Sequence, residues 1–233
     1  MKILAINSAL PFTEIALLNG DEVVLNESWP SNFDEVEKLL PAIQKALELD
    51  GKIDKLLVVT GPGAFTGLRV GVTIANTLAF AQSVPIISVS TFDYLHHKIG
   101  EEDAPKTAIM LRAGSGVAMK LSHEEKVRTM KKEEIQNFLS DQKAIQYIVS
   151  DIKEEARENY QLSKGIQWQE YENLRTLPDS VKEIMAQNPP EHQQVKPASL
   201  LRPISPKVKS RYLPKRLLKK KYALHCRYTH WKP

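Results

Sequence analysis

A glycine-rich loop between two apolar stretches has the residue types of an anion-binding turn. Gly61-Pro62-Gly63 follows Lys55–Val59, an aliphatic run that predicts a buried strand, and precedes Leu68–Gln82, which predicts a helix. Thr66 stands where the N-cap of this helix is expected. The first N–H groups of such a helix lack partners within it and can bind an anion. The glycine spacing matches neither standard phosphate-binding loop, however, and no Lys-Ser or Lys-Thr pair follows. A structural turn and a ligand-binding loop therefore both stay open.

Groupings that would indicate metal binding or nucleophilic catalysis are weak elsewhere in the sequence. There is no H-x-x-x-H pair, and His225 and His230 are five residues apart. His96 and His97 are adjacent, so they point in different directions on a helix, and we expect them on a solvated face. The single cysteine, Cys226, excludes an internal disulfide and a cysteine-rich metal site. We therefore expect no catalytic constellation and no metal site.

The predicted helix after the loop carries a stripe of small residues. Gly67, Gly71, Ala75 and Ala79 recur every four positions, so they lie on one face and let another backbone come close. The other faces are mostly apolar, and a helix that is apolar nearly all round must be buried nearly all round. One interpretation is a central core helix. The other, which we adopt as the prediction, is a helix whose small-residue stripe contacts a second protein.

The composition is that of a globular protein. Hydrophobic residues make up 42% and charged residues 26% of the 233 residues, which suits one large domain or two small ones. No run approaches the roughly 18 apolar residues of a membrane span, and Met1–Leu10 lacks the apolar core of a signal peptide. We therefore expect a cytoplasmic protein without membrane contact.

The charges are divided unevenly along the chain. No Asp or Glu follows Glu191, whereas twelve Lys and Arg do; subtracting these from the total of 32 leaves 20 basic against 28 acidic residues, a formal −8 for residues 1–191. The basic run is interleaved with Tyr212 and Tyr222, which offer stacking surfaces to nucleic acid. A solvated tail, or one that binds the acidic body, is the alternative. The candidate RNA contacts are Lys215, Arg216, Lys219, Lys220 and Lys221.

The first hundred residues alternate between predicted strands and helices. Asn19-Gly20 predicts a hairpin turn, Ser31 and Asn32 are candidate N-caps, and Pro41 should bend its helix or displace the start. The predicted strands are Ile3–Ile6, Thr13–Leu18, Glu22–Glu27, Lys55–Val59 and Pro85–Ser90, and the predicted helices are Phe33–Leu49, Leu68–Gln82 and Thr91–Lys98.

A charged link, Glu101–Lys106, leads to a second set of predicted elements. Asp151 and two glutamates open one of its helices, where negative charge is favourable, so we expect a structural role for them. The elements are a hairpin over Thr107–Leu121, a strand over Ile145–Val149, and helices over Lys131–Leu139, Ile152–Tyr160 and Pro178–Ala186. We predict an N-terminal subdomain of residues 1–100, a smaller C-terminal subdomain of residues 101–190, and a Pro-rich, basic tail of residues 191–233.

The run Gly61-Pro62-Gly63-Ala64-Phe65-Thr66-Gly67-Leu68-Arg69-Val70-Gly71 resembles the G-P-G-S-F-T-G-L-R-x-G signature of the TsaB (YeaZ) family, with Ala64 at the serine position. The resemblance extends over roughly residues 1–100. It implies an α/β fold of the actin-like, ribonuclease-H-like type, with two subdomains, mixed sheets and flanking helices. Nucleotide-binding members of that superfamily end the first strand at an aspartate. This chain has Asn7 there, which argues against nucleotide hydrolysis.

The same resemblance implies a function. We expect a non-catalytic subunit that supports the threonylcarbamoyl modification of adenosine 37 in ANN-decoding tRNAs, with the catalytic paralogue TsaD and the ATPase TsaE as partners and a homodimer as the alternative assembly. No cofactor of its own is expected, and ATP or ADP would lie near the junction with the partners. Other classes stay open: an autonomous actin-like kinase or transferase, and an RNA-binding adaptor that acts through the tail.

The resemblance also assigns residues to the expected contacts. The implied partner-interface residues are Phe33, Val36, Leu40, Ile43, Gly67, Arg69, Gly71, Ala75, Leu78 and Ala79. The signature-loop residues implied to lie near nucleotide are Gly61, Pro62, Gly63, Phe65 and Thr66. Two departures from the family pattern concern its surface: Glu35 and Val36 stand at a histidine and a serine position, and no aspartate precedes Arg112.

Overall fold

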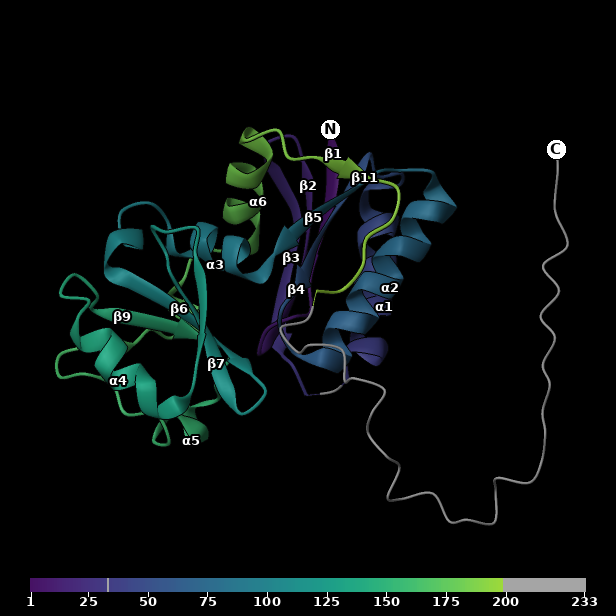
Figure 1. Cartoon of the computed structure of the whole chain (residues 1–233). Helices are drawn as coiled ribbons and strands as arrows, with labels where there is room; N and C mark the ends of the chain where they lie inside the picture. Colours follow the sequence, from purple (N-terminus) through teal and green to yellow (C-terminus); the bar gives the residue numbers. More distant parts are fainter. Residues whose placement is uncertain (33, 199–233) are drawn as a thin grey trace, which may run out of the picture. The chain divides into compact units, whose positions relative to one another are not determined.

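The computed structural model describes residues 1–32 and 34–198, except for the side chains of Val36 and Asp50 (Figure 1). Some predicted contacts therefore lie outside the described part of the chain. They are Phe33 and the Val36 side chain at the expected partner interface, and the expected RNA contacts Lys215, Arg216, Lys219, Lys220 and Lys221.

A six-stranded mixed sheet forms the first half of the fold. Its order is β11-β5-β4-β1-β2-β3, with β1, β4 and β5 parallel to one another and the other three antiparallel to their neighbours. All five strands predicted for residues 1–100 are present. The strands are β1 (Lys2–Asn7), β2 (Phe12–Asn19), β3 (Glu22–Pro30), β4 (Lys55–Gly61), β5 (Ile86–Ser90) and β11 (Glu191–His192).

Helices cover both faces of this sheet, two on each (Figure 1). Alternate side chains of β1 divide between the faces: Leu4 and Ile6 pack with α1 and α2, whereas Ile3 and Ala5 pack with α3 and α6. Strands covered on both faces are apolar throughout, which is why these runs were visible in the sequence. The helices are α1 (Glu35–Asp50), α2 (Phe65–Gln82), α3 (Thr91–Ile99) and α6 (Leu177–Ala186).

A five-stranded sheet of order β10-β9-β6-β7-β8 forms the second half. Met110 and Ile148 on one face pack with α4, whereas Ile109 and Leu111 on the other join the same apolar cluster as the first sheet. The elements are β6 (Thr107–Ala113), β7 (Gly116–Leu121), β8 (Val127–Met130), β9 (Tyr147–Ser150), β10 (Gln167–Trp168), α4 (Lys132–Ser140), α5 (Glu154–Arg157), and the short 3-10 helices η1 (Ala104–Lys106) and η2 (Tyr171–Asn173). The sequence did not predict β8 and β10, and the helix predicted over Ile152–Tyr160 is a single turn.

The predicted boundary between the second subdomain and the tail is wrong. Helix α6 packs with the first sheet, and β11 pairs with β5. The chain then runs along α2: the Val195 N–H and carbonyl each bond to the Asn76 side chain at 2.9 Å. The Ala198 N–H donates to the Thr60 carbonyl at 2.6 Å. Residues 191–198 therefore belong to the folded body, because they complete the first sheet and fasten α2.

Two predicted helix starts are also wrong. The N-cap of α2 is Ala64, so Thr66 lies within the first turn. The N-cap of α1 is Asp34, and the Ser31 hydroxyl bonds to the Glu35 side chain instead of capping. Pro41 lies inside α1 and does not displace its start.

The hairpin turn between β2 and β3 is centred one residue later than expected. Asn19 pairs with Glu22, so the loop residues are Gly20 and Asp21. Gly20 has φ of 61°, the left-handed conformation that glycine adopts without strain.

Within the described residues, no helix combines the length and the apolarity needed to cross a bilayer.

Candidate functional site beside the signature loop

The signature loop, residues 61–67, packs directly on the backbone that follows β1. The Ala64 N–H donates to the Ala9 carbonyl at 2.8 Å. A Cβ on Gly63 would lie 2.1 Å from the same carbonyl oxygen, and Gly61 has φ of 107°. Both glycines are therefore required by backbone geometry, one by a close approach and the other by a conformation that side chains disfavour.

A carboxylate of the chain itself lies against the start of α2. Glu35, in the first turn of α1, is buried and accepts a hydrogen bond from the Ser31 hydroxyl. A Cβ on Gly67 would lie 3.2 Å from Glu35 Oε1 and 2.5 Å from the Ser8 carbonyl oxygen. Negative charge is favourable beside a helix N-terminus. Because the protein supplies that charge, the structure favours the structural interpretation of the loop.

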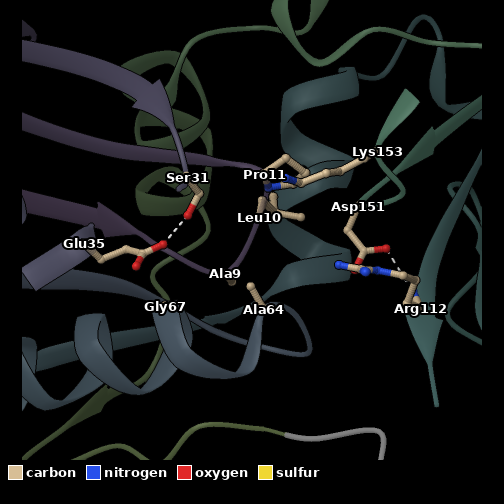
Figure 2. Close-up of a pocket in the computed structure, with 10 residues that line it drawn as sticks. All are labelled: Ala9, Leu10, Pro11, Ser31, Glu35, Ala64, Gly67, Arg112, Asp151 and Lys153. Atoms are coloured by element: carbon tan, nitrogen blue, oxygen red, sulfur yellow. Dashed lines mark hydrogen bonds and ion pairs between the residues drawn. The ribbon is translucent and has the colours of Figure 1, made fainter. Parts of the chain in front are cut away.

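A cavity of about 70 Å³ lies between the signature loop and the end of β9 (Figure 2). Its titratable side chains are Glu35 on α1, Arg112 on β6, and Asp151 and Lys153 after β9. Two carboxylates and two cations leave it without net formal charge. Pockets for small-molecule ligands usually measure about 300–1,000 Å³, so this cavity lies below the usual range.

Asp151 and Arg112 close the cavity on the side of the second sheet. The Arg112 backbone N–H donates to Asp151 Oδ1 at 2.9 Å, and its Nε lies 3.4 Å from Oδ2. Burial raises the pKa of the Asp151 carboxyl, while the hydrogen bonds and charge of Arg112 oppose the rise. Asp151 precedes α5 instead of opening it, so its predicted role at a helix start is wrong. The family pattern has an aspartate just before Arg112; in this chain Asp151, the residue after the neighbouring strand β9, pairs with Arg112 instead.

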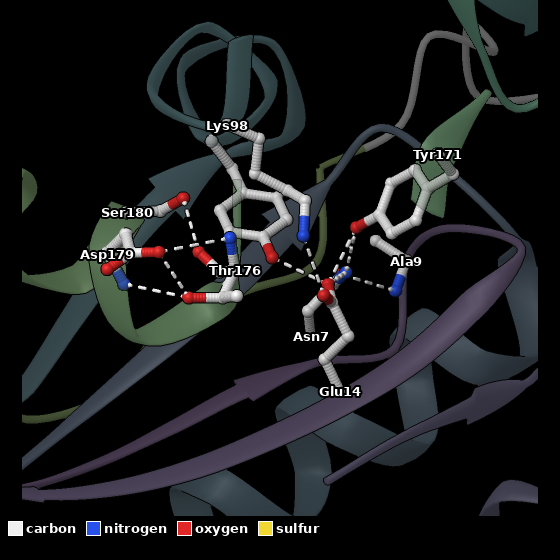
Figure 3. Close-up of polar contacts among 9 residues, drawn as sticks. Asn7, Ala9, Glu14, Lys98, Tyr171, Thr176, Asp179 and Ser180 are labelled. Carbon is white, nitrogen blue, oxygen red and sulfur yellow. Dashed lines mark hydrogen bonds and ion pairs between the residues drawn. The ribbon is translucent and has the colours of Figure 1, made fainter. Parts of the chain in front are cut away.

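Behind the loop after β1, a buried carboxylate accepts bonds from several elements (Figure 3). Glu14 on β2 is the cross-strand partner of Asn7 on β1. Its Oε2 accepts from Asn7 Nδ2 at 2.8 Å, from the Tyr94 hydroxyl at 2.5 Å and from the Tyr171 hydroxyl at 2.6 Å. Its Oε1 pairs with Lys98 Nζ at 2.7 Å. We call these five residues the Glu14 cluster.

The chemistry of the Glu14 cluster is structural. Burial, together with the two neighbours Tyr171 and Glu14, raises the pKa of Tyr94 well above 10.0, and burial with Glu14 does the same for Tyr171. Both hydroxyls therefore stay protonated and donate. Four donors surround the carboxylate, and one of them, the Lys98 ammonium, neutralises its charge. Across residues 1–32 and 34–198, no group of three or more His, Cys, Asp and Glu side chains is placed to hold a metal ion.

The small-residue stripe of α2 faces the protein's own first sheet. A Cβ on Gly71 would lie 2.1 Å from Ser8 Oγ, and Ala75 and Ala79 are buried in the cluster between the sheet and α1. The predicted partner contact along this stripe, Gly67 included, is therefore wrong. Close backbone packing inside the subunit explains the spacing.

The other predicted interface residues divide between core and surface. Ile43 is buried between α1 and the sheet, Leu78 is half-buried and Leu40 is 49% exposed. At the start of α2, Arg69 is exposed and its guanidinium lies 3.7 Å from the centroid of the Phe65 ring. The exposed sides of α1 and α2 thus remain available for contact.

The prediction that His96 and His97 lie on a solvated face is wrong. His96 Nδ1 lies 2.9 Å from Ser122 Oγ, and His97 Nδ1 lies 3.3 Å from Glu183 Oε2. His97 is buried and His96 half-buried. Burial, with the nearby cations, lowers the pKa of His96. The two histidines join α3 to the residue after β7 and to α6 respectively, so their role is structural.

Sequence reasoning missed Glu14, Tyr171 and Lys153. Glu14 did carry a signal: it is an acidic residue within an otherwise apolar strand, and such a residue needs a partner. Tyr171 and Lys153 carried none, because their partners lie far away in the sequence.

Comparisons with known proteins identify relatives of this chain. The family model described as "TsaD: tRNA N6-adenosine threonylcarbamoyltransferase" matches residues 34–181. The chain is similar to the tRNA threonylcarbamoyladenosine biosynthesis protein TsaB of Bacillus subtilis, at 34% identity over 99 residues (41% of this chain and 43% of the relative). It is also similar to TsaB of Escherichia coli, at 38% identity over 96 residues (39% and 41%). The alignments thus span less than half the length of these relatives.

Solved structures extend the similarity over most of the described fold. YeaZ from Pseudomonas aeruginosa matches with a TM-score of 0.63 and 19% identity, over 84% of this chain and 98% of that chain. This confirms the predicted actin-like, ribonuclease-H-like fold. The chain belongs to the family that the model describes, tRNA N6-adenosine threonylcarbamoyltransferase (TsaD), and to the TsaB (YeaZ) group that these relatives and structures represent.

Proposed function

We propose that this chain is a partner subunit, without catalytic activity of its own, in the biosynthesis of tRNA N6-threonylcarbamoyladenosine, and that it binds and supports a TsaD-like paralogue. The relatives are named as biosynthesis proteins of this modification. The observation that carries the proposal is the exposed side of α2, where Phe65 and Phe80 are 58% and 88% exposed. The two rings lie near opposite ends of this side of the helix, so the contact that we propose runs along its length.

The contact that we propose extends to α1. Leu40 and Leu49 are also about half exposed on that helix, which lies next to α2 (Figure 1). The resemblance noted in the sequence implies a partner contact on the same two helices, although on the stripe that the structure buries. We therefore move the contact to their exposed sides. A homodimer of the isolated chain would use the same surface.

The non-catalytic part of the proposal has separate support. Asn7 cannot supply the negative charge that nucleotide-binding members of the fold place at the end of β1. The carboxylate on the next strand, Glu14, is paired with Lys98 and accepts three further hydrogen bonds. The cavity beside the signature loop is also small. We propose that ATP or ADP binds near the junction with the partners, among them a TsaE-like ATPase, and not to this chain alone.

Calorimetric titration with the TsaD-like paralogue of the same organism tests the contact. Truncating a hot-spot residue of an interface costs about 2 kcal/mol or more; because Phe80 is the most exposed large apolar side chain of α2, we expect Phe80→Ser to weaken binding by about tenfold or more. Val127→Ser is the matched control, because Val127 is an exposed apolar residue (40%) on β8 of the other sheet. Binding that survives both Phe65→Ser and Phe80→Ser would contradict the proposal. ATP turnover by the purified chain would contradict its non-catalytic part.

A second candidate function, RNA binding through the basic tail, also has an observation in its favour. The last described residue, Ala198, bonds to Thr60 at the end of β4, so the described part of the chain ends beside the signature loop. Residues 202–233 contain eleven Lys and Arg and no acidic residue. We propose that this segment binds tRNA phosphates, which the partner-subunit proposal does not require.

A further inference from the structure

The proposed partner contact makes no use of the Glu14 cluster, yet this cluster joins four elements of the fold. Asn7 comes from β1, Glu14 from β2, Tyr94 and Lys98 from α3, and Tyr171 from η2 (Figure 3). Glu14 and Lys98 are 4% and 2% exposed. A buried ion pair adds little stability compared with well-packed apolar residues, and in some proteins it fixes a specific geometry instead. The contribution of this cluster therefore lies in what it positions.

Hydrogen bonds lead from Glu14 to the start of α2. Because Glu14 accepts from Asn7 Nδ2, the amide oxygen of Asn7 is turned toward the Ala9 N–H, from which it accepts at 3.1 Å. The Ala9 carbonyl then accepts from the Ala64 N–H, at the N-cap of α2, at 2.8 Å. Three successive hydrogen bonds thus connect the buried carboxylate with the signature loop.

Ser8 makes a second connection from the same loop. Its hydroxyl donates to the Gly67 carbonyl at 2.8 Å, and Gly71 leaves just enough room for that hydroxyl. Residues 8 and 9 therefore hold the first two turns of α2 as well as the signature loop. A shift of Asn7 would be transmitted to both.

Tyr171 is the member of the cluster that comes from a distant part of the chain. Its ring stacks on Phe12, with centroids 5.4 Å apart and planes 3° from parallel. Phe12 and Tyr171 together line two separate cavities, of about 230 Å³ and about 170 Å³. Both cavities give open space beside the ring, into which it can turn once its stacking on Phe12 and the hydroxyl bond to Glu14 are broken. Tyr94, in contrast, is fully buried.

We propose that Glu14 is a positioning residue for the signature loop and the start of α2, and that the Tyr171 hydroxyl is its adjustable donor. When the Tyr171 hydroxyl donates to Glu14, Glu14 keeps Asn7 in place and the start of α2 is ordered. When the Tyr171 ring is turned into either cavity, the start of α2 is less ordered. This proposal deepens the proposed function and rests on it in one respect: order at the start of α2 sets the affinity for the TsaD-like paralogue.

Amide hydrogen exchange of the isolated full chain, resolved by residue, tests the positioning. Tyr171→Phe keeps the ring and removes one donor to a charged group, so we expect the Ala9 and Ala64 amides to exchange about tenfold faster or more. Tyr147→Phe, on β9, is the matched control and should change neither. Glu14→Gln with Lys98→Met removes the ion pair at similar volume, and it should release the same two amides.

Two exchange results would overturn the proposal: unchanged exchange at Ala9 and Ala64 in both test variants, or equal acceleration throughout both sheets, which is the result of a purely structural role. The paralogue titration then tests the second step. We expect Tyr171→Phe to weaken binding and Tyr147→Phe to leave it unchanged; equal affinities despite faster exchange would overturn the coupling. If the unmodified chain does not bind the paralogue, the proposed function fails, while the exchange result still decides the positioning.

Discussion

Asn7 and Glu14 face each other across β1 and β2, and Asn7 Nδ2 lies 2.8 Å from Glu14 Oε2. Nucleotide-binding members of this fold have a carboxylate where Asn7 stands. In this chain the amide donates to a carboxylate on the next strand, which Lys98 also neutralises. The negative charge near the end of β1 is therefore neutralised and hydrogen-bonded by groups of the protein itself.

Asn7→Asp should destabilise the protein at neutral pH. The change sets a second buried carboxylate against Glu14 and removes a donor, so we expect the free energy of unfolding to fall by about 3 kcal/mol, as for other uncompensated buried charges. Urea unfolding measures the decrease. Asn7→Asp with Glu14→Gln restores one carboxylate and one amide, so it should recover part of the stability. An unaltered midpoint for Asn7→Asp alone would show that the pair is not close in solution.

Gly71→Ala tests whether the small-residue stripe packs inside the subunit. The new Cβ would lie 2.1 Å from Ser8 Oγ, and overpacking costs about 1–3 kcal/mol, against which helix propensity returns about 1 kcal/mol. We expect a net decrease in stability, measured by thermal melting. Adding Ser8→Ala removes the clashing oxygen and should restore the melting temperature.

The exposed Thr73→Ala on the same helix is the control for propensity. If Gly71→Ala melts at the normal temperature but fails to bind the paralogue, the stripe belongs to the partner interface, as the sequence predicts.

The predictions of β1, β2, β4 and the helix after the signature loop were correct because extensive burial leaves long apolar runs in the sequence. The side of α2 that contacts its own sheet could not be predicted in the same way. A stripe of small residues shows that some backbone comes close, but Ser8, which fills the space at Gly71, lies far away in the sequence.

The Glu14 cluster and the Asp151–Arg112 pair depend on sheet pairing. Glu14 is separated by 80 residues or more from Tyr94, Lys98 and Tyr171, and Asp151 meets Arg112 because β6 and β9 are parallel neighbours. Strand order and register must be known before such partners can be named. Residues 191–198 were assigned to the tail for a similar reason, since a two-residue strand leaves no periodicity to detect.

Asp151→Asn should alter the pH dependence of stability. Burial raises the pKa of Asp151 above 3.8, so its protonated form favours the folded state, and this advantage disappears as the pH rises from the unfolded pKa through the folded one. Asparagine stays neutral throughout. The free energy of unfolding of Asp151→Asn, measured with urea, should therefore increase relative to that of the unmodified protein as the pH rises above about 4.

Arg112→Gln provides the opposite comparison for the same carboxyl. It removes the cation that opposes the rise in the Asp151 pKa, so its stability should fall more steeply over this pH range. A difference between Asp151→Asn and the unmodified protein that does not vary with pH would contradict the burial of a charged Asp151.

The last prediction concerns the basic tail, which can be tested without knowledge of its structure. If residues 202–233 bind tRNA phosphates, a chain that ends at residue 201 should bind tRNA more weakly, and the slope of log affinity against log salt should fall by about 0.7–0.9 for each phosphate that the protein no longer neutralises. A full-length variant with Gln at Lys215, Arg216, Lys219, Lys220 and Lys221 separates charge from aromatic stacking, and its slope should fall by up to about 4. Fluorescence anisotropy with labelled tRNA at several salt concentrations measures all three proteins. Because residues 1–191, which make up most of the folded body, carry a net negative charge, this body should repel RNA, so the truncated chain should show little binding of its own. Equal affinities and slopes for the three proteins would leave the tail without a role in RNA binding.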